Sequence, residues 1–321
     1  MRRRDFMTLL GGAAVAWPRG AWGQGRIHHV GILASQPLPP IQRFIRKLRE
    51  YGYLESQNLH LEMRFVEGHD ERYPEFAAQL VKVPVDVIVT WGAPAAVAAK
   101  DATTTLPIVM GAIADPVSVG IVSNLAHPDG NITGFASQNV DLEVKRLEVL
   151  RDLVPHLLRV GILANVFNPV FTATLRQLRS EAEELRLSID VFEVRSGGDL
   201  QEALARLPEA RPDGVLVAPD LLLLSNRADI AEALAKNRLP AVYQFREYAG
   251  VGGLVIHGAN LSVLFERAAG YVDRILRGTK PIDLPVQLAT EFELIINLRT
   301  AARIGLTIPP ALIARADEVL E

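Results

Sequence analysis

The chain has 321 residues, 49% of them hydrophobic and 22% charged, which is enough to bury a sizeable core and to form two domains. Its formal net charge is −3, and it is more negative still without the arginine-rich first 24 residues, so a nucleic acid backbone is a poor electrostatic match. The absence of cysteine excludes disulfides, thiolate metal sites, cysteine nucleophiles and lipid attachment through an N-terminal cysteine.

Residues 1–24 have the pattern of an export signal. Three arginines at positions 2–4 precede a short apolar segment, Phe6–Trp17, and Ala21–Gly23 offers small residues at the two positions that a signal peptidase needs. The paired arginines stand before an aromatic and an apolar residue, which favours the twin-arginine route. About a dozen apolar residues are too few to span a bilayer, which needs roughly 20. We therefore predict a periplasmic protein without a lipid anchor.

The remainder of the chain contains one series of strands twice. The apolar run Val30–Ala34 is repeated as Val160–Ala164, and each copy reads as a strand buried on both faces. Further segments match in the same order at a similar offset: Leu61–Gly68 with Ile189–Ser196, Asp86–Val89 with Asp213–Val217, Leu106–Val109 with Leu239–Val242, and, more loosely, Gly130–Gly134 with Gly253–Gly258. The repeat predicts two similar lobes.

Apolar residues at helical spacing separate these strands. The predicted helices cover Ile41–Leu48, Tyr73–Val81, Ala93–Ala102, Phe171–Leu185 and Ile230–Leu234. An alternation of strand, helix and strand at this spacing predicts right-handed crossovers and parallel sheets.

A helix also follows the last strand of each copy, at Leu142–Leu153 and Leu261–Leu276. In a two-lobe parallel fold such segments usually cross to the opposite lobe. The predicted fold is therefore α/β, with two similar doubly wound parallel-sheet lobes joined by crossover hinge strands. The N-terminal lobe would comprise residues 25–137 and 251–280, and the C-terminal lobe residues 138–250 and 281–321.

The carboxyl ends of the predicted strands define a candidate ligand site, because ligands bind there in open parallel sheets and helix N-termini offer unpaired N–H groups. The residues at those ends are Ser35, Gln36, Trp91, Gly92, Ala93 and Asp115 in the first lobe, and Asn165, Asn168, Asp220, Tyr243, Phe245 and Glu247 in the second. Aromatic rings, carboxylates and helix N–H groups together suit a small polar ligand with an apolar part.

The chemistry of these side chains suggests their roles. Asp115 or Asp220 would pair with a ligand ammonium, and Ser35 with the N–H groups of Gly92 and Ala93 would hold a carboxylate. An aromatic side chain would cover the apolar part, namely Trp91, Tyr243 or Phe245.

Several of these residues have a purely structural alternative. Asp115 and Asn168 precede prolines and fit turns or helix caps, and Asp220 fits a cap of the following helix. Trp91 fits ordinary packing between the lobes.

Signals of catalysis are weak. The seven histidines show no metal-ligand spacing, and the chain has neither a phosphate-binding loop ending in Gly-Lys-Ser/Thr nor a Gly-x-Ser-x-Gly elbow. Residues 35–40 follow the first strand without a glycine-rich turn, which disfavours a dinucleotide. We predict a monomeric binding protein that is not an enzyme and has no cofactor or metal.

A set of motifs along nearly the whole chain indicates a known family. The motifs are Met1–Phe6 with Leu9–Ala14, Thr103–Val109, Pro128–Gly134, Phe245–Glu247, Ile275–Pro281, Phe292–Leu298, Gly305–Pro310 and Ala314–Glu318. Together they resemble the substrate-binding proteins of ABC importers, specifically the group that includes tryptophan- and tyrosine-binding members.

The resemblance implies a type I periplasmic-binding fold with three crossover strands, closure on a ligand, and docking to a membrane permease with its ATPase. It also implies ligand contacts on the loops that carry Ser35, Asp115, Asn165 and Asp220. The chain departs from the family pattern at the Ser35–Pro37 turn and at Trp91, whose bulk would reshape the pocket. An aromatic amino acid is therefore not implied as the ligand.

Two other functions remain open from the sequence. The same fold could serve as a periplasmic sensor domain that feeds a signalling receptor, whereas a repressor is disfavoured by the leader and by the lack of a helix-turn-helix stretch before Ile27. An exported α/β hydrolase would need a nucleophile with a base in reach, and only scattered serines and histidines are present.

Overall fold

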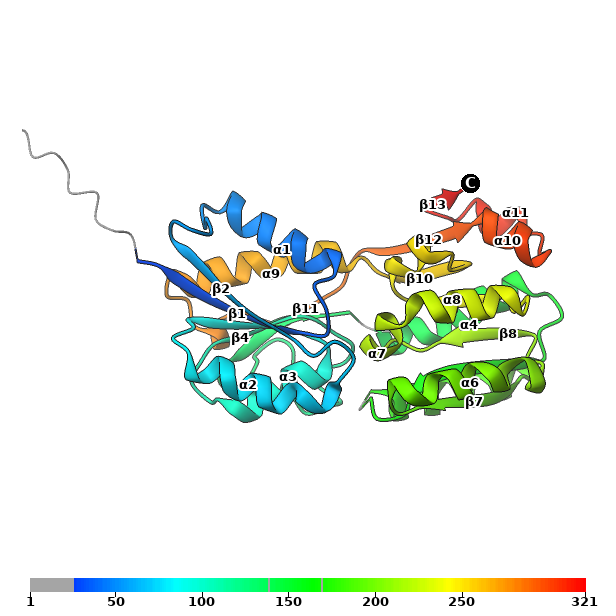
Figure 1. Ribbon diagram of the computed structural model, residues 1–321, viewed down its shortest axis with the longest axis horizontal. Coiled ribbons are helices and arrows are strands. Elements are labelled where there is room, and N and C mark those ends of the chain that lie inside the picture. Colours follow the sequence, from blue (N-terminus) through cyan, green and yellow to red (C-terminus); the bar gives the residue numbers. More distant parts are fainter. Residues whose placement is uncertain (1–25, 138, 169) are drawn as a thin grey trace, which may run out of the picture.

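The computed structural model describes residues 26–137, 139–168 and 170–321. Figure 1 shows two α/β lobes side by side, with the start of the described chain on the first lobe and the C-terminus on the second. The predicted export signal lies outside the described residues. Within the described ranges, no helix is long and apolar enough to cross a membrane.

A six-stranded sheet forms the first lobe, with the order β11-β5-β4-β3-β1-β2 and every pair parallel. Its strands are β1 (His28–Ala34), β2 (Leu59–Phe65), β3 (Val87–Trp91), β4 (Ile108–Ile113), β5 (Ile132–Ala136) and β11 (Gln287–Leu288). Its helices are α1 (Pro39–Glu50), the 3₁₀ turn η1 (Asp70–Arg72), α2 (Tyr73–Lys82), α3 (Ala93–Ala102), α9 (Leu261–Leu276) and η3 (Pro281–Asp283). In Figure 1, α1 and α9 cover one face of this sheet and α2 and α3 the other.

The second lobe has a seven-stranded sheet with the order β13-β12-β10-β9-β8-β6-β7. Its strands are β6 (Arg159–Asn165), β7 (Ser188–Val194), β8 (Gly214–Val217), β9 (Ala241–Tyr243), β10 (Val255–Ala259), β12 (Phe292–Asn297) and β13 (Glu318–Leu320). Its helices are α4 (Asn139–Leu153), α5 (Phe171–Leu185), α6 (Gly197–Ala210), α7 (Leu221–Ser225), α8 (Arg227–Lys236), the 3₁₀ turn η2 (Arg246–Val251), α10 (Leu298–Ile304) and α11 (Pro310–Ile313).

The strand register confirms the internal repeat. Gly31 of β1 pairs with Ile88 of β3, and Gly161 of β6, the matching glycine, pairs with Val215 of β8. The first strand of each lobe lies inside its sheet, second from one edge, and most of its residues are buried. This explains why both copies of the repeat read as uninterrupted apolar runs.

Both helices that were expected to change lobes do so. After β5 the chain leaves the first sheet, and α4 packs against β8, β9 and β10 of the second; α9 returns and packs against α1 and β4 of the first. On α1, the apolar side chains Ile41, Phe44 and Leu48 are buried, as their helical spacing predicts.

The strand pairing differs from the predicted lobe boundaries. β10 lies beside β9 in the second sheet, so residues 255–259 do not belong with the N-terminal lobe, to which 251–280 were assigned. β11 pairs with β5 in the first sheet, so residues 287–288 do not belong with the C-terminal lobe, to which 281–321 were assigned. Neither sheet is complete when the chain first leaves it, because β11 is added to the first sheet and β12 and β13 to the second after later crossings. β12 pairs antiparallel to β10.

Three passages of chain connect the lobes, and backbone hydrogen bonds join them. The N–H of Ala289 donates to the carbonyl oxygen of Ala136 (2.7 Å), and the N–H of Asn260 donates to that of Glu291 (3.0 Å). The three passages therefore form a small hydrogen-bonded unit.

A buried ion pair fixes the second-lobe side of these passages. Arg146 and Glu143 of α4 are 0% and 1% exposed, and the Arg146 Nε donates to a Glu143 carboxylate oxygen over 3.2 Å. Arg146 Nη1 also donates to the carbonyl oxygen of His257 on β10 (2.8 Å). The His257 ring in turn lies 3.2 Å, Nδ1 to O, from the carbonyl oxygen of Glu293 on β12. One arginine thus links the elements that adjoin all three passages.

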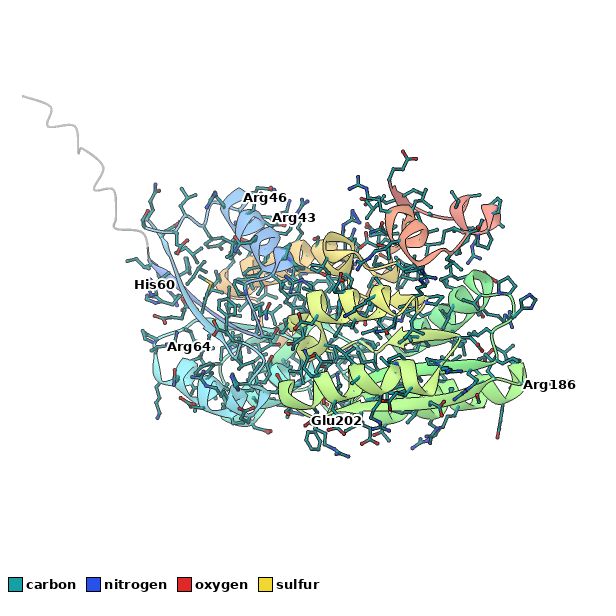
Figure 2. The ribbon with its side chains drawn as sticks, turned by 45° about the vertical axis from the view of Figure 1, so that its right-hand side comes forward. Arg43, Arg46, His60, Arg64, Arg186 and Glu202 are labelled. Carbon is teal, nitrogen blue, oxygen red and sulfur yellow. The ribbon has the colours of Figure 1, made fainter. Side chains whose placement is uncertain are left out.

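Most charged side chains lie on the outer surface of the lobes. Figure 2 shows His60 and Arg64 on β2, at the free edge of the first sheet, Glu202 on the outer side of α6 and Arg186 at the far end of the second lobe. Arg43, also labelled there, approaches Glu266 of α9 to 3.6 Å, N to O, in an exposed ion pair. Exposed pairs of this kind contribute little to stability.

Candidate ligand-binding cleft

A narrow cleft lies between the lobes. Its cavity volume is about 60 Å³, which is room for a few water molecules. From the first lobe and the crossing segments the lining residues are Asp70, Tyr73, Trp91, Gly92, Ala93, Pro94, Ala112, Ala114, Ser137 and Leu261. From the second lobe they are Asn165, Asn168, Val170, Phe171, Thr174, Ala218, Pro219, Asp220, Leu221, Gln244 and Phe245.

The structure brings together more than half of the predicted site residues. Those in the lining are Trp91, Gly92, Ala93, Asn165, Asn168, Asp220 and Phe245. They follow the strands β3, β6, β8 and β9, because the carboxyl ends of parallel strands in the two facing sheets meet at the junction. Their roles as ligand contacts stay a prediction.

In the first lobe, three predicted residues lie outside this lining. Ser35 is fully buried and its hydroxyl has no hydrogen-bond partner in the described ranges, and Gln36 is half-buried beside it. Asp115 Oδ1 accepts the N–H groups of Val117 (3.2 Å) and Ser118 (3.0 Å). For Asp115, the geometry is that of the turn-capping alternative.

Two predicted residues of the second lobe also lie outside the lining. Tyr243 is buried and stacks on Tyr248, with 4.3 Å between ring centroids. Glu247 lines a different groove, together with Arg227 and Arg246, and burial raises the pKa of its carboxyl. Tyr243 is the last residue of β9, and Glu247 lies in η2, which follows β9.

Asp220 is the centre of a hydrogen-bonded network in the second lobe. Its Oδ1 accepts the N–H groups of Leu222 (2.8 Å) and Leu223 (3.2 Å), and thereby caps α7. Its Oδ2 accepts the side-chain amides of Asn165 (3.1 Å) and Asn168 (2.9 Å). Asp220 therefore combines the predicted cap with a position in the cleft.

The charge of Asp220 is expensive to bury. Burial raises the pKa of its carboxyl to about 6, the hydrogen bond from Asn168 opposes this rise, and the charge of Asp70 adds to it. Asp70 belongs to the first lobe, so the two acids interact across the cleft.

The sequence interpretation missed Asp70 and Tyr73. Both follow β2, where Glu67 (φ 52°) and Gly68 (φ 87°) adopt left-handed backbone conformations that redirect the chain toward the second lobe. Tyr73 is 1% exposed. In the described part of the chain, neither its buried hydroxyl nor the buried Asp70 Oδ1 has a hydrogen-bond partner. Burial raises the pKa of both side chains, and that of Tyr73 lies well above its usual value.

Aromatic and apolar side chains form much of the remaining wall. Trp91 is 2% exposed and meets Phe265 of α9 edge to face, with 5.1 Å between centroids. Because Phe265 belongs to the same lobe, this contact packs Trp91 within the first lobe. Phe171 and Phe245 line the second-lobe side.

The start of α3 faces the cleft and offers donors to an anion. The N–H of Gly92 is already used, because it donates to the carbonyl oxygen of Ala112 (3.2 Å), and Pro94 has no N–H. The N–H groups of Ala93 and Ala95 belong to the first turn, where no helical carbonyl is available to accept them. The predicted carboxylate donors therefore change from Gly92 and Ala93 to Ala93 and Ala95.

The lobes touch beside the cleft. Gly92 has φ +85°, and a Cβ added to it would lie 2.8 Å from Leu221 Cδ1 of the opposite lobe. A Cβ on Gly68 would lie 3.8 Å from Leu222 Cδ1. The two glycines thus permit a close approach of the lobes on the α7 side.

The charges of the lining have one sign. Asp70 and Asp220 are its acidic residues, one from each lobe, and no lysine, arginine or histidine is among the lining residues of the described chain. In the same described ranges, no group of three or more His, Cys, Asp or Glu side chains could hold a metal ion. The acidic residues of the lining therefore favour a positive charge over a negative one in the cleft.

Two facing parallel-sheet lobes, three connections and a cleft at the strand ends define a type I periplasmic-binding fold, which is also the fold of the structural neighbours. Residues 40–320 match the family model described as ABC transporter substrate binding protein, and the chain belongs to this family. This confirms the predicted family and fold. Substrate-binding proteins are a non-enzymatic class, which confirms that the protein is not an enzyme and removes the hydrolase alternative.

Several known proteins are similar over most of the chain. A tyrosine-binding protein of Clostridioides difficile (strain R20291) is 25% identical over 254 residues, which are 79% of this chain and 73% of that protein. The crystal structure of a conserved domain protein from Vibrio cholerae O1 biovar El Tor N16961 is 26% identical, with a TM-score of 0.85 and coverage of 92% and 100% of the two chains. An ABC domain from Streptococcus pneumoniae in complex with L-Trp is 24% identical, with a TM-score of 0.83 and the same coverage.

Proposed function

We propose that the protein captures an aromatic amino acid or a close analogue in the inter-lobe cleft, in the periplasm, and delivers it to a membrane permease and its ATPase. The observation that carries this proposal is the composition of the cleft. It combines aromatic walls, helix N–H groups and two acids that have no basic residue beside them in the described lining. The C. difficile relative, named a tyrosine-binding protein, and the L-Trp complex of the S. pneumoniae relative support the same ligand class.

The chemistry of the cleft supports one orientation of such a ligand. The ammonium lies toward the acidic residues, the carboxylate toward the N–H groups of Ala93 and Ala95, and the ring between Trp91 and the second-lobe phenylalanines. A ligand that touches both lobes stabilises the closed state, because the open state offers only half of these contacts.

The cleft is too small for such a ligand, so the lobes must separate for the ligand to enter. The few water volumes available are smaller than an aromatic amino acid. The three hydrogen-bonded passages are the natural axis for this motion, because they alone connect the two sheets within the described chain.

Isothermal titration calorimetry of the mature protein with L-tryptophan, L-tyrosine and L-phenylalanine tests the ligand class, with glycine and a pentose as controls. We expect saturable binding of at least one aromatic amino acid. At a ligand concentration 100 times the Kd, the folded state should gain about 2.7 kcal/mol of stability, which raises the melting temperature. Binding of the pentose alone would contradict the proposal.

The location and the partner need separate tests. The export prediction is tested by sequencing the N-terminus of the protein recovered from the periplasmic fraction, where cleavage after Gly23 or close to it is expected. The transport role is tested with a reconstituted permease and its ATPase, whose ATP hydrolysis should rise only with the liganded protein. Co-purification with a receptor kinase instead would favour the sensor alternative.

A further inference from the structure

The first lobe buries polar atoms at the cleft without satisfying them. Tyr73 lines the cleft and is 1% exposed, and its hydroxyl has no hydrogen-bond partner in the described chain. Asp70 Oδ1 is in the same state. Folded proteins pair nearly all buried polar atoms, so two unpaired ones beside a ligand cleft point to a ligand atom.

These atoms face an acid whose own hydrogen bonds are complete. Asp220 Oδ1 accepts two backbone N–H groups of α7, and its Oδ2 accepts the amides of Asn165 and Asn168. Asp220 can therefore attract a cation by its charge but has few lone pairs left to accept from it. By contrast, no side-chain hydrogen bond of Asp70 occurs within the described residues.

The Tyr73 hydroxyl lies where both charges act. Its pKa is raised first by burial, then by the charge of Asp70 and then by that of Asp220, so the phenol stays protonated and neutral. A neutral hydroxyl still has oxygen lone pairs that accept a hydrogen bond.

We propose that Asp70 and Tyr73 form the first-lobe half of an ammonium subsite, so that the cleft takes ligands with a protonated amine and rejects analogues without one. The amine donates one hydrogen bond to Asp70 Oδ1 and one to the Tyr73 hydroxyl oxygen, and Asp220 supplies a second negative charge from the opposite lobe. This inference rests on the proposed function for the size of the ligand, and it specifies the group that the ligand must carry.

The subsite also explains why closure depends on the ligand. Asp70 and Asp220 belong to different lobes, so closing the empty cleft brings two like charges together where little water is left to screen them. A protonated amine between them removes this repulsion. The ligand then favours the closed state through the charge that it carries as well as through its contacts.

Three indole compounds separate the amine from the carboxylate: L-tryptophan has both, tryptamine has only the amine, and indole-3-propionate has only the carboxylate. Titration calorimetry should show binding of L-tryptophan and tryptamine, with indole-3-propionate at least tenfold weaker, since a hydrogen bond to a charged group is worth a factor of ten or more. Tyrosine, tyramine and 4-hydroxyphenylpropionate form the matching phenol set. Equal or tighter binding of the compounds without an amine overturns the inference.

Two conservative variants test the residues themselves. Asp70→Asn should weaken the binding of the amine-bearing compounds about tenfold or more and leave the affinity for indole-3-propionate undiminished. Tyr73→Phe should weaken the binding of the amine-bearing compounds severalfold. The melting temperature of the empty protein should stay equal or rise, because the variant removes an unpaired hydroxyl. Asp129→Asn is the matched control in the same lobe, since the exposed Asp129 accepts the N–H of Ser123 (3.2 Å) outside the lining, and it should bind like the wild type.

A merely structural role would give a different result. It predicts a lower melting temperature for the empty Tyr73→Phe protein and an equal loss of affinity for amines and acids. Either outcome, or wild-type affinity in Asp70→Asn, overturns the inference while amino-acid binding by the wild type still supports the proposed function. Conversely, binding of tryptamine and tyramine but of no amino acid would overturn the proposed function and leave the subsite standing. If no amine binds, both fail.

Discussion

The two lobes share a strand order but present different kinds of polar surface to the cleft. In the second lobe, Asn165, Asn168 and Asp220 are hydrogen-bonded to one another and to the start of α7. In the first lobe, Asp70 and Tyr73 bring polar atoms to the cleft and leave them unpaired. We infer that the second lobe is organised before the ligand arrives, whereas the first lobe is completed by it.

The same contrast appears at equivalent positions of the repeat. Ser35 follows the first strand of its lobe and Asn165 ends the matching strand, but Ser35 is fully buried outside the cleft lining and Asn165 lines the cleft. The acid of the first lobe follows β2, and the acid of the second follows β8. Duplication therefore preserved the sheets, while the chemistry moved among the loops.

The variant with the largest expected effect tests whether the hydrogen-bonded network of the second lobe has a counterpart beside the three passages that connect the lobes. Arg146→Met removes the partner of a buried carboxylate, Glu143, and should destabilise the protein by about 3–5 kcal/mol in urea denaturation. Arg315→Met is the control, because the Arg315–Asp152 pair joins the same helix at the surface and should cost less than about 1 kcal/mol. Equal losses in the two variants would contradict a structural role for the buried pair.

A second test compares the acids of the two lobes directly. Asp220→Ala removes the cap of α7 and leaves two asparagine amides without an acceptor, so it should cost about 3 kcal/mol of folding free energy in the empty protein. Asp70→Ala should cost less than about 0.5 kcal/mol in the same urea titration, because no hydrogen bond of its side chain is lost. Similar costs for both would remove the contrast between the lobes.

The parts of this molecule that follow from local pattern were predictable. The buried strands of the repeat, and the bounds of α3 and α9, follow from apolar runs and helical spacing that a few neighbouring residues determine. The sheet to which β10 and β11 belong, and the antiparallel pairing of β12, depend on partners far along the chain, so the lobe boundaries were placed wrongly there.

The candidate site shows the same limit. Asn165 ends β6 and Asp220 follows β8, two interior strands, and a rule about strand ends is enough to find them. Asp70 and Tyr73 follow an edge strand and reach the cleft only because Glu67 and Gly68 turn the chain back. Gly68, at the end of an alternating strand and just before a polar stretch, was the signal available in the sequence.

The contact between the lobes is the subject of a third test. Gly92→Ala places a methyl group against Leu221 and strains a backbone with φ +85°, which should cost about 2 kcal/mol of stability and weaken ligand binding by holding the lobes apart. Gly120→Ala is the control, because its φ is +71° and nothing lies near its Cβ, so it should destabilise the protein without weakening binding. Calorimetry with an aromatic amino acid reads out the difference. Unchanged affinity in Gly92→Ala would show that this contact does not matter for closure.

The smallest expected effect concerns pH. The pKa of Asp220 is raised to about 6 in the folded protein, against about 4 in an unfolded chain, so the folded state holds this proton more tightly and its stability falls as the pH rises through that window. Between pH 5 and pH 7 the empty protein should lose about 1 kcal/mol through this group. Asp220→Asn should lose that much less over the same interval, as measured by urea denaturation at both pH values. An identical pH dependence of stability in the wild type and in Asp220→Asn would show that protonation of Asp220 does not contribute to it.

The described chain begins at Arg26 beside β1 and ends at Glu321 after β13, on opposite lobes. Any movement that brings the lobes together must therefore alter the separation of the two ends. A donor fluorophore at one end and an acceptor at the other would turn ligand capture into a change in energy transfer. The topology alone thus supplies the layout of a reagentless optical biosensor, with no need to place a dye in the cleft.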